Sequence, residues 1–472
     1  MDIGNVFLTA LDWIVDAGSI VMLPVIFTIF GIALGTKPLK ALKAGITVGV
    51  GFVGINLVMG LLGDSLGAAA QAMAANLGLN LTIIDIGWPA AAAIAYGTSM
   101  GALSIPIAIA LNLVLLIVGL TKTLNIDIWN IWHTAFIGSI VIAATGNVLL
   151  GLITMVAHLM LVFLLGDLIQ PHVEKFYGFK NITFPHGGSL PGYVFALPVN
   201  WLLGKIPGIR DIKVDDNVIR EKFGIMGDNT MIGVLIGLVI GLAAGYEIRA
   251  ACLLAVQTAA IMVILPKMVA LLMEGLTPIS ESASEFIKKR MPDRDIYIGM
   301  DTALTVGHPS VLALVLIMIP VTTLLSFVVP GNQVLPFGDL AGLPFLICLI
   351  VVACDGNTFR AIVSAILYVA IGLLIATWAS PLITSAAQAA NFDLSGYSEV
   401  TNLIGGALWT TPLFVLLAQY TGMFGAIGIA VLCLVVMVVR RNKALALAKA
   451  EETVVEGEAA ASAGNSSEVK EN

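Results

Sequence analysis

Long apolar runs divide the chain into regularly spaced segments. Many of these runs are about 16 to 24 residues long, close to the roughly 20 that cross a bilayer as a helix. In the first half of the chain the segments lie near 18–35, 44–62, 83–97, 103–120, 132–145 and 147–168. In the second half they lie near 231–246, 250–273, 296–307, 311–329, 340–354 and 361–379, with a last one near 411–439. The pattern predicts an all-α polytopic membrane protein.

The second set of segments is the first set displaced by 210 residues. Paired glycine and polar positions support this displacement more strongly than overall identity does. When the two halves are aligned at this displacement without a gap, several of these residues are identical. They are Gly31 and Gly241, Gly35 and Gly245, Asp85-Ile86 and Asp295-Ile296, Gly97 and Gly307, Gly146-Asn147 and Gly356-Asn357, Pro171 and Pro381, and Asn181 and Asn391. We therefore predict an internal repeat, with the first copy at 1–171 and the second at 229–381.

The distribution of basic residues predicts that the two copies have opposite orientation. Lys and Arg favour the cytoplasmic side of short loops. Loop 36–43 holds three Lys, whereas 64–82 holds no Lys or Arg. In the second copy the bias is reversed, with one Arg in 245–250 and four basic residues in 288–294. The connector 172–228 carries seven basic residues, so we expect it to be cytoplasmic.

Opposite orientation requires an odd number of crossings in each copy. Because each copy has six apolar segments, one of them should enter and leave on the same side as a re-entrant hairpin. Five crossings per repeat and a final helix, within a linker and helix at 382–441, give about eleven transmembrane helices. The N-terminus is then outside, and the polar, acidic segment 442–472 is predicted to be a disordered cytoplasmic tail.

Two polar interruptions mark equivalent places in the two copies. "PGNQVLPFGDLAG", 330–342, separates two apolar runs, and its counterpart is "LTKTLNIDIWNIWH", 120–133. Irregular backbone at membrane depth is tolerated only where protein or a wet cavity surrounds it. Asn332, Gln333 and Asp339 supply donors and acceptors suited to a ligand with many hydroxyls. The alternative is a loop whose polar groups satisfy only its own backbone.

Ionisable residues inside the apolar segments are candidates for function. Asp301 and His308 are seven residues apart, so they share one face if that segment is helical. They either contact a ligand or lock neighbouring helices together. His133 ends the motif "WNIWH", whose Trp129 and Trp132 form either a stacking surface or an interfacial belt.

Three other polar positions have a structural alternative. His186, in "FPHGGSLPG", belongs to a gate, to a surface for a cytoplasmic partner, or to a plain loop. His158 lies in the middle of an apolar segment and is best interpreted as a core histidine bonded to a neighbouring helix. Asp355 adjoins the repeated Gly-Asn pair, which indicates a helix break, and it is a further candidate for substrate contact.

Composition narrows the possible functions. The chain is 58% hydrophobic and 11% charged, too few charges for the surface of a soluble protein of 472 residues. Its four Cys lie singly in apolar runs and lack the spacing of a metal site. No nucleophile triad or phosphate loop is present, and nothing suggests nucleic acid. We expect no catalytic residue, metal or cofactor. The N-terminus lacks the basic region of a cleavable signal peptide.

From about residue 10 to 440 the sequence resembles the galactitol-type membrane component, enzyme IIC, of the bacterial phosphoenolpyruvate-dependent sugar phosphotransferase system. The motifs that carry the resemblance are "MLPVIFTIFGIALG", "GFVGINLVMGLLGDSLG", "IDIGWP", "NIDIWNIWH", "FPHG", "EKFGIMG", "GLTPI", "GHPSV" and "PGNQVLPFGDLA". This family is similar to the ascorbate-type components, which are eleven-helix homodimers with inverted repeats and an elevator-like motion.

The resemblance implies group translocation at the bacterial inner membrane. A polyol such as galactitol would be taken up and phosphorylated by a separate IIB protein, whose phosphocysteine is recharged by the phosphohistidine of IIA. The predicted substrate-binding residues are His133, His186, Asp301, His308, Asn332, Gln333, Asp339, Asp355, Thr98 and Trp88. The small apolar residues that follow "IDIGWP" leave another hexitol, pentitol or related sugar open. An ion-coupled secondary transporter that releases its substrate unmodified is the alternative function.

Overall fold

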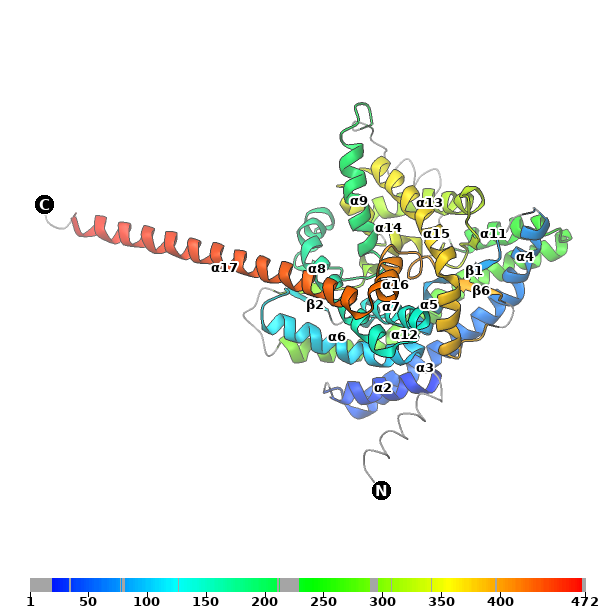
Figure 1. Cartoon of the computed structure of the whole chain (residues 1–472), viewed down its shortest axis with the longest axis horizontal. Helices are drawn as coiled ribbons and strands as arrows, with labels where there is room; N and C mark the ends of the chain where they lie inside the picture. Colours follow the sequence, from blue (N-terminus) through cyan, green and yellow to red (C-terminus); the bar gives the residue numbers. More distant parts are fainter. Residues whose placement is uncertain are drawn as a thin grey trace, which may run out of the picture.

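The protein is a mostly helical, polytopic membrane protein in the computed structural model (Figure 1). The structure describes residues 19–468 except 34, 77, 79–80, 126, 210–211, 213–228, 289–295, 307, 341 and 395–396. Within these residues four helical stretches are long and apolar enough to cross a membrane: Val148–Tyr177, Pro309–Val328, Thr358–Ala389 and Met423–Ala446. Shorter apolar helices surround them, so the count of about eleven crossings stays a prediction.

The helices follow the predicted repeat. In the first half they are α2 (Ser19–Ala33), α3 (Pro38–Leu61), the π-helix η1 (Leu62–Gly67), α4 (Ala68–Asn76), α5 (Gly87–Gly97), α6 (Ser99–Ile117), the 3₁₀ helix η2 (Ile128–Asn130), α7 (Trp132–Thr145), α8 (Val148–Tyr177) and α9 (Leu190–Leu203). In the second half they are α11 (Asn229–Ala243), α12 (Ile248–Lys288), the 3₁₀ helix η4 (Thr302–Thr305), α13 (Pro309–Val328), α14 (Leu343–Ala353), α15 (Thr358–Ala389), α16 (Thr410–Thr421) and α17 (Met423–Glu468).

The displacement of 210 residues reappears in fine structural detail. The helices α2 and α11 start and end 210 residues apart, and so do the first residues of α8 and α15. The caps of α8 and α15 are the same: Asn147 and Asn357 each accept a backbone N–H at 3.0 Å through their side chains. The glycines before them are both left-handed, with φ of 68° and 73°. Equivalent sequence positions therefore make equivalent local structure.

Six short strands correct the all-α prediction. They are β1 (Ile83–Asp85), β2 (Thr123–Asn125), β3 (Ile182–Thr183), β4 (Tyr297–Gly299), β5 (Val334–Leu335) and β6 (Glu399–Thr401), and they form two parallel three-stranded sheets. Runs of two or three residues are too short to show the alternation that reveals a strand. Their pairing supplies hydrogen bonds to backbone that leaves the helical path within an apolar protein.

The two sheets exchange strands between the halves of the chain. One sheet has the order β5-β1-β6, with Ile83 opposite Val334, and the other has the order β2-β4-β3, with Thr123 opposite Tyr297. The central strand of each sheet comes from one half, and both of its neighbours come from the other half. At a displacement of 210, β2 coincides with the stretch that contains β5. One flanking strand of each sheet therefore occupies an equivalent position in its half of the chain.

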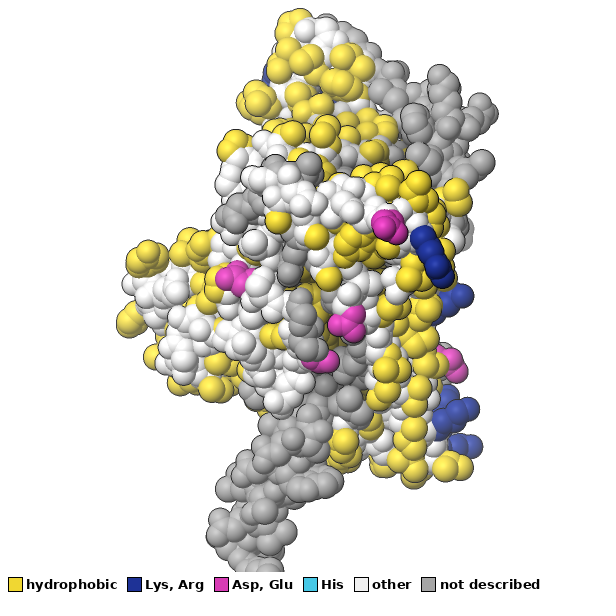
Figure 2. Space-filling view, turned by 90° about the vertical axis from the view of Figure 1, so that its right-hand side faces the viewer, with side chains coloured by type: hydrophobic (Ala, Val, Ile, Leu, Met, Phe, Trp, Pro, Cys, Tyr) yellow, Lys and Arg dark blue, Asp and Glu magenta, His cyan; other side chains and the backbone are white. Residues whose placement is uncertain are grey.

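The helices form two groups, and the strands contact mainly α6, α8, α13 and α15. The helices α2, α3, α11 and α12 pack mainly against one another, whereas α7, α8, α13, α14 and α15 form the centre of the other group, with α9, α16 and α17 against it. Apolar side chains cover much of the face in Figure 2, with few charges apart from Lys and Arg along one edge. Leu57 and Val256 are 73% and 64% exposed, as suits side chains that face lipid.

The C-terminal segment differs from the prediction of a disordered tail. The helix α17 continues to Glu468 and projects away from the body (Figure 1). Ala, Glu and Lys in this segment are strong helix formers, and extending an existing helix requires no new nucleation. Composition alone therefore misjudged the segment. Residues 1–18 and 469–472 and most of 210–228 lie outside the described residues, so predictions about them are untested.

Candidate functional site

The hairpin 330–342 satisfies its own polar groups. The amide nitrogen of Asn332 donates to the carbonyls of Ser326 and Val334 at 2.8 and 3.0 Å, and its oxygen accepts the N–H of Val334 at 3.1 Å. The backbone of Gln333 donates to the hydroxyl of Thr377 and accepts the N–H of Ile83. These bonds favour the alternative that the sequence left open, in which Asn332 holds the hairpin rather than a ligand.

Asp339 organises the backbone around it. Its Oδ1 accepts the N–H of Trp88 at 2.6 Å, and its Oδ2 accepts the N–H groups of Leu403 and Ile404 at 2.7 and 3.0 Å. The N–H of Asp339 in turn donates to the carboxylate of Asp85 at 2.8 Å. Both carboxylates are fully buried. Asp339, predicted to contact substrate, instead ties the start of α5 to the loop that follows β6.

A group of aromatic rings lies where several helices begin. We call Trp88, Trp129, His133, His186 and Phe345 the aromatic cluster. Ring centroids are 5.9 Å apart for Trp88 and Trp129, and 5.5 Å apart for Trp88 and Phe345. His186 lies 6.3 Å from Phe345 and 4.6 Å from His133. The structure thus brings together three of the predicted site residues: Trp88, His133 and His186.

Unpaired polar atoms gather at one side of this cluster. Trp129, Asn130 and His133 are at most 3% exposed. Trp129 Nε1, Asn130 Oδ1 and both ring nitrogens of His133 are buried without a hydrogen-bond partner among the described residues. The backbone of Ile404 lies near His133 without reaching hydrogen-bonding geometry. Buried polar atoms are rarely left unpaired, so this group indicates a place where a ligand binds.

The "FPHGG" segment reaches the cluster because two of its residues lack a side chain. A Cβ on Gly187 would lie 2.6 Å from Cβ of His133, and one on Gly188 would lie 2.5 Å from its Nε2. Any other residue would push the segment away from the imidazole. The Gly-Gly pair therefore sets the contact between His186 and His133.

Asp127 and Asp301 meet beside the cluster. Each follows a strand of the β2-β4-β3 sheet, and Oδ2 of Asp127 accepts the N–H of Asp301 at 3.1 Å. Asn130 connects them to the unpaired atoms, because its amide donates to Asn125 Oδ1 at 2.9 Å and to the carbonyl of Met300 at 3.3 Å. Asp301, a predicted site residue, thus lies next to residues of the candidate site.

Thr98 and His308 cap helices in equivalent places of the two halves. Thr98 Oγ1 accepts the N–H of Gly101 at 3.2 Å, and His308 Nδ1 accepts the N–H of Ser310 at 3.3 Å. Asp301 and His308 are expected to share a helix face if their segment is helical, and that condition is not met, because η4 ends at Thr305 and α13 begins only at Pro309. The proline and its neighbours break the segment, and His308 packs against Phe176 and Tyr177 instead.

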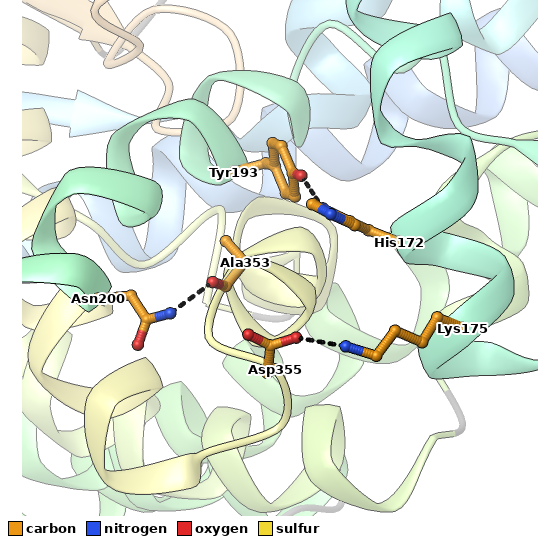
Figure 3. Close-up of polar contacts among 6 residues, drawn as sticks. All are labelled: His172, Lys175, Tyr193, Asn200, Ala353 and Asp355. Atoms are coloured by element: carbon orange, nitrogen blue, oxygen red, sulfur yellow. Dashed lines mark hydrogen bonds and ion pairs between the residues drawn. The ribbon is translucent and has the colours of Figure 1, made fainter. Parts of the chain in front are cut away.

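Asp355 lies at the junction of α14 and α15, with its carboxylate directed at Lys175 (Figure 3). Its side chain is 72% exposed and forms an ion pair with Lys175 of α8 at 3.2 Å. Nearby, Asn200 of α9 donates to the carbonyl of Ala353 at 2.9 Å, and His172 is hydrogen-bonded to the hydroxyl of Tyr193. These contacts connect α8, α9 and the α14–α15 junction. They do not bring Asp355 to the aromatic cluster.

Sequence reasoning missed several residues of the site. Asp85, Asp127 and Asn130 were not singled out, although Ile-Asp-Ile occurs at 84–86 and again at 126–128. That recurrence is the signal that could have found the two aspartates. The interpretation of His158 as a core residue is confirmed, because its ring is hydrogen-bonded to Thr134 of α7 at 2.9 Å. Among the described residues, no group of His, Cys, Asp and Glu could hold a metal ion.

Comparison with known proteins identifies the family. A family model described as "PTS system sugar-specific permease component", EIIC-GAT, matches residues 13–396. The chain belongs to this family. It is 41% identical over 371 residues to the PTS system galactitol-specific EIIC components of Escherichia coli K12 and O157:H7, covering 79% of this chain and 82% of each relative. It is 36% identical over 435 residues to a putative permease IIC component of E. coli K12, covering 92% of this chain and 99% of that protein.

Membership in the EIIC-GAT family confirms the resemblance predicted from the motifs. The protein is therefore a galactitol-type IIC permease component of the phosphotransferase system and a multi-pass membrane protein. All five residues of the aromatic cluster lie within the part of the chain that the family model matches.

Proposed function

We propose that the protein takes up galactitol or a related polyol, which binds at the aromatic cluster and is phosphorylated by separate IIB and IIA proteins. One observation carries the assignment of the site. The unpaired atoms comprise a donor on Trp129, an acceptor on Asn130, and one donor and one acceptor on neutral His133. A chain of hydroxyls, each able to donate and accept, matches this mixture.

The surroundings of these atoms favour a ligand with apolar faces. Indole and phenyl rings of Trp88, Trp129 and Phe345 offer flat surfaces to the C–H faces of a carbon chain. Asp127 and Asp301 add carboxylate acceptors beside the cluster. The relatives named as galactitol-specific support the same class of substrate.

The proposed architecture is a pair of inverted repeats that move a polyol across the membrane by an elevator-like motion. The repeated helix bounds and the exchange of strands between halves support two structurally equivalent units. The positive-inside rule supports their inversion, with 64–82 outside and with 36–43, 172–228 and 288–294 inside. We include a homodimer, about eleven crossings, an outside N-terminus and a cytoplasmic C-terminus in this proposal.

Transport assays distinguish phosphotransfer from the alternative of an ion-coupled transporter. Membrane vesicles that contain the protein are loaded with or without IIA, IIB and phosphoenolpyruvate, supplied with labelled galactitol, and their internal product is analysed. Galactitol phosphate that accumulates only with the phosphorelay supports the proposal. Accumulation of unmodified galactitol that depends on an ion gradient would replace it with the secondary transporter.

Trp129→Phe tests the site itself, because it removes the unpaired N–H and keeps most of the ring. We expect polyol affinity to fall about tenfold, the effect of one lost buried hydrogen bond of about 1–1.5 kcal/mol. The thermal stability of the empty protein should stay equal or rise, since an unpaired buried donor is removed. The matched control is Trp378→Phe, at a side chain that is 40% exposed on α15. Unchanged polyol affinity in Trp129→Phe would mean that the polyol binds at a different place.

A further inference from the structure

The hydroxyl of Ser189 determines which nitrogen of His186 carries a proton. Ser189 Oγ donates its single proton to the carbonyl of Phe345, which can only accept. Oγ also has Thr302 Oγ1 as a neighbour at 3.2 Å and His186 Nδ1 at 2.7 Å, besides the thiol of Cys348. Because Ser189 has no second proton, Thr302 and His186 must both donate to it. His186 is therefore protonated on Nδ1, and its Nε2 holds a free lone pair.

The free nitrogen belongs to a buried ring within the proposed polyol site. His186 is 4% exposed and packs edge to face against His133 at 4.6 Å. Its recorded hydrogen bond runs through Nδ1, and no described residue pairs with Nε2. Ser189, which bonds Nδ1, is itself held from the second half of the chain, by the carbonyl of Phe345 in α14 and by Thr302 of η4. An imidazole fixed in this way presents a base rather than a donor at Nε2.

The segment that carries His186 connects α8 to α9 and passes through the interior of the protein. It follows α8, forms β3 in the β2-β4-β3 sheet, and continues into α9, which stands out from the body (Figure 1). This segment lies within the connector 172–228, whose basic residues predict a cytoplasmic location. His186 thus reaches the proposed polyol site from the predicted cytoplasmic side, the side on which the phosphoryl donor acts.

We infer that His186 is the general base for phosphorylation of the bound polyol; this inference rests on the proposed function. A polyol hydroxyl oxygen attacks the phosphorus of a phosphothiol on the cytoplasmic partner and forms the new O–P bond. The P–S bond breaks, and its electron pair leaves with sulfur as a thiolate. The hydroxyl proton passes to Nε2 of His186, in the same role as a side chain that accepts the substrate proton in other phosphoryl transfers.

His186→Asn separates this role from binding and from folding. The amide nitrogen of Asn takes the place of Nδ1 and keeps a donor for Ser189, while the position of Nε2 is lost. Because His186 belongs to the proposed binding site, we expect galactitol affinity, measured by calorimetry on purified protein, to fall by at most about tenfold, the effect of one lost hydrogen bond. The rate of galactitol phosphate formation at saturating galactitol, with phosphorylated IIB, should fall about 100-fold or more. His158→Asn, at a buried histidine bonded to Thr134, is the matched control.

The possible results distinguish failure of the proposed function from failure of the inference about His186. An unchanged rate in His186→Asn overturns the inference, and so does a rate loss that saturating galactitol restores, because His186 then only binds substrate. If the unaltered protein binds galactitol but forms no phosphate ester with the relay present, the proposed function fails and the inference with it. If His186→Asn does not fold, Ser189→Ala replaces it, since it frees the imidazole to change tautomer. A lower rate at saturating galactitol then supports the inference, and an unchanged rate overturns it.

Discussion

At the scale of single residues, the site is a place where the empty protein gives up stability. Four polar atoms of Trp129, Asn130 and His133 are buried without partners, and each such atom typically costs about 1–3 kcal/mol. The hydrogen-bonded network of Asp85 and Asp339 holds the surrounding backbone in place despite this cost. A ligand that pairs the four atoms regains the free energy that the fold has given up. Affinity and instability therefore originate in the same residues.

Asn332 belongs to the opposite kind of residue, one whose bonds hold the fold. Asn332→Ala removes bonds to Ser326 and Val334 and leaves their buried backbone groups unpaired. We expect a loss of roughly 1–3 kcal/mol per unpaired group in thermal or chemical unfolding, with unchanged polyol affinity in the folded fraction. Gln333→Ala, whose side chain is not part of this network, should change stability little. Normal stability with weakened binding in Asn332→Ala would restore the ligand role.

At the scale of elements, the break between α14 and α15 combines strained backbone with a weak ion pair. Asp355 has φ of 49°, a left-handed conformation that favours glycine, and its partner Lys175 is 75% exposed. Exposed ion pairs contribute at most about 1 kcal/mol. The sharp turn at this junction is thus a property of the backbone more than of the charge.

Comparison of Asp355→Gly with Asp355→Ala tests this account of the junction. Both lose the ion pair, but only glycine relieves the backbone, so the glycine variant should be more stable by about 1 kcal/mol. Galactitol affinity should be unchanged in both, because Asp355 is remote from the aromatic cluster in its contacts. Melting temperature and calorimetric titration measure the two quantities. Weaker galactitol binding in both variants would indicate that Asp355 contacts the substrate.

The sequence predicted the helices well, because apolar length is a property of a single segment. The repeat stays a prediction, which the matching bounds of α2 and α11 support. The sequence located the pair of polar interruptions, but it did not show that the amide of Asn332 is bonded within its own hairpin. Whether an amide such as that of Asn332 faces a ligand or its own hairpin depends on partners that only the fold brings near. The strands were missed for a similar reason: two or three residues have no pattern of their own, and their pairing partners lie far away in the chain.

At the scale of the whole molecule, strand exchange makes the two halves depend on each other. Residues 1–209 contain β1, β2 and β3, and residues 210–472 contain β4, β5 and β6, so that neither half can form a complete sheet. Backbone left unpaired within an apolar environment is costly.

Expression of the two halves as separate chains tests this dependence. We expect neither half alone to accumulate in membranes, and we expect co-expression to restore a complex that binds galactitol. Membrane abundance by immunoblot and co-purification through a tag on one half measure the result, with the intact chain as reference. A half that is stable and protease-resistant alone would contradict the dependence on exchanged strands.

The exchanged strands also constrain how such a chain could have arisen by duplication of a shorter gene. The product of a single copy, 1–171 or 229–381, would have carried one central strand and one flanking strand, which belong to different sheets. Two such products, each lending its flanking strand to the other's central strand, would form one strand pair of each sheet. Fusion of the two genes would then have turned an association between molecules into a connection within one molecule. In that history, dimerisation preceded the present chain, and the repeat is its record.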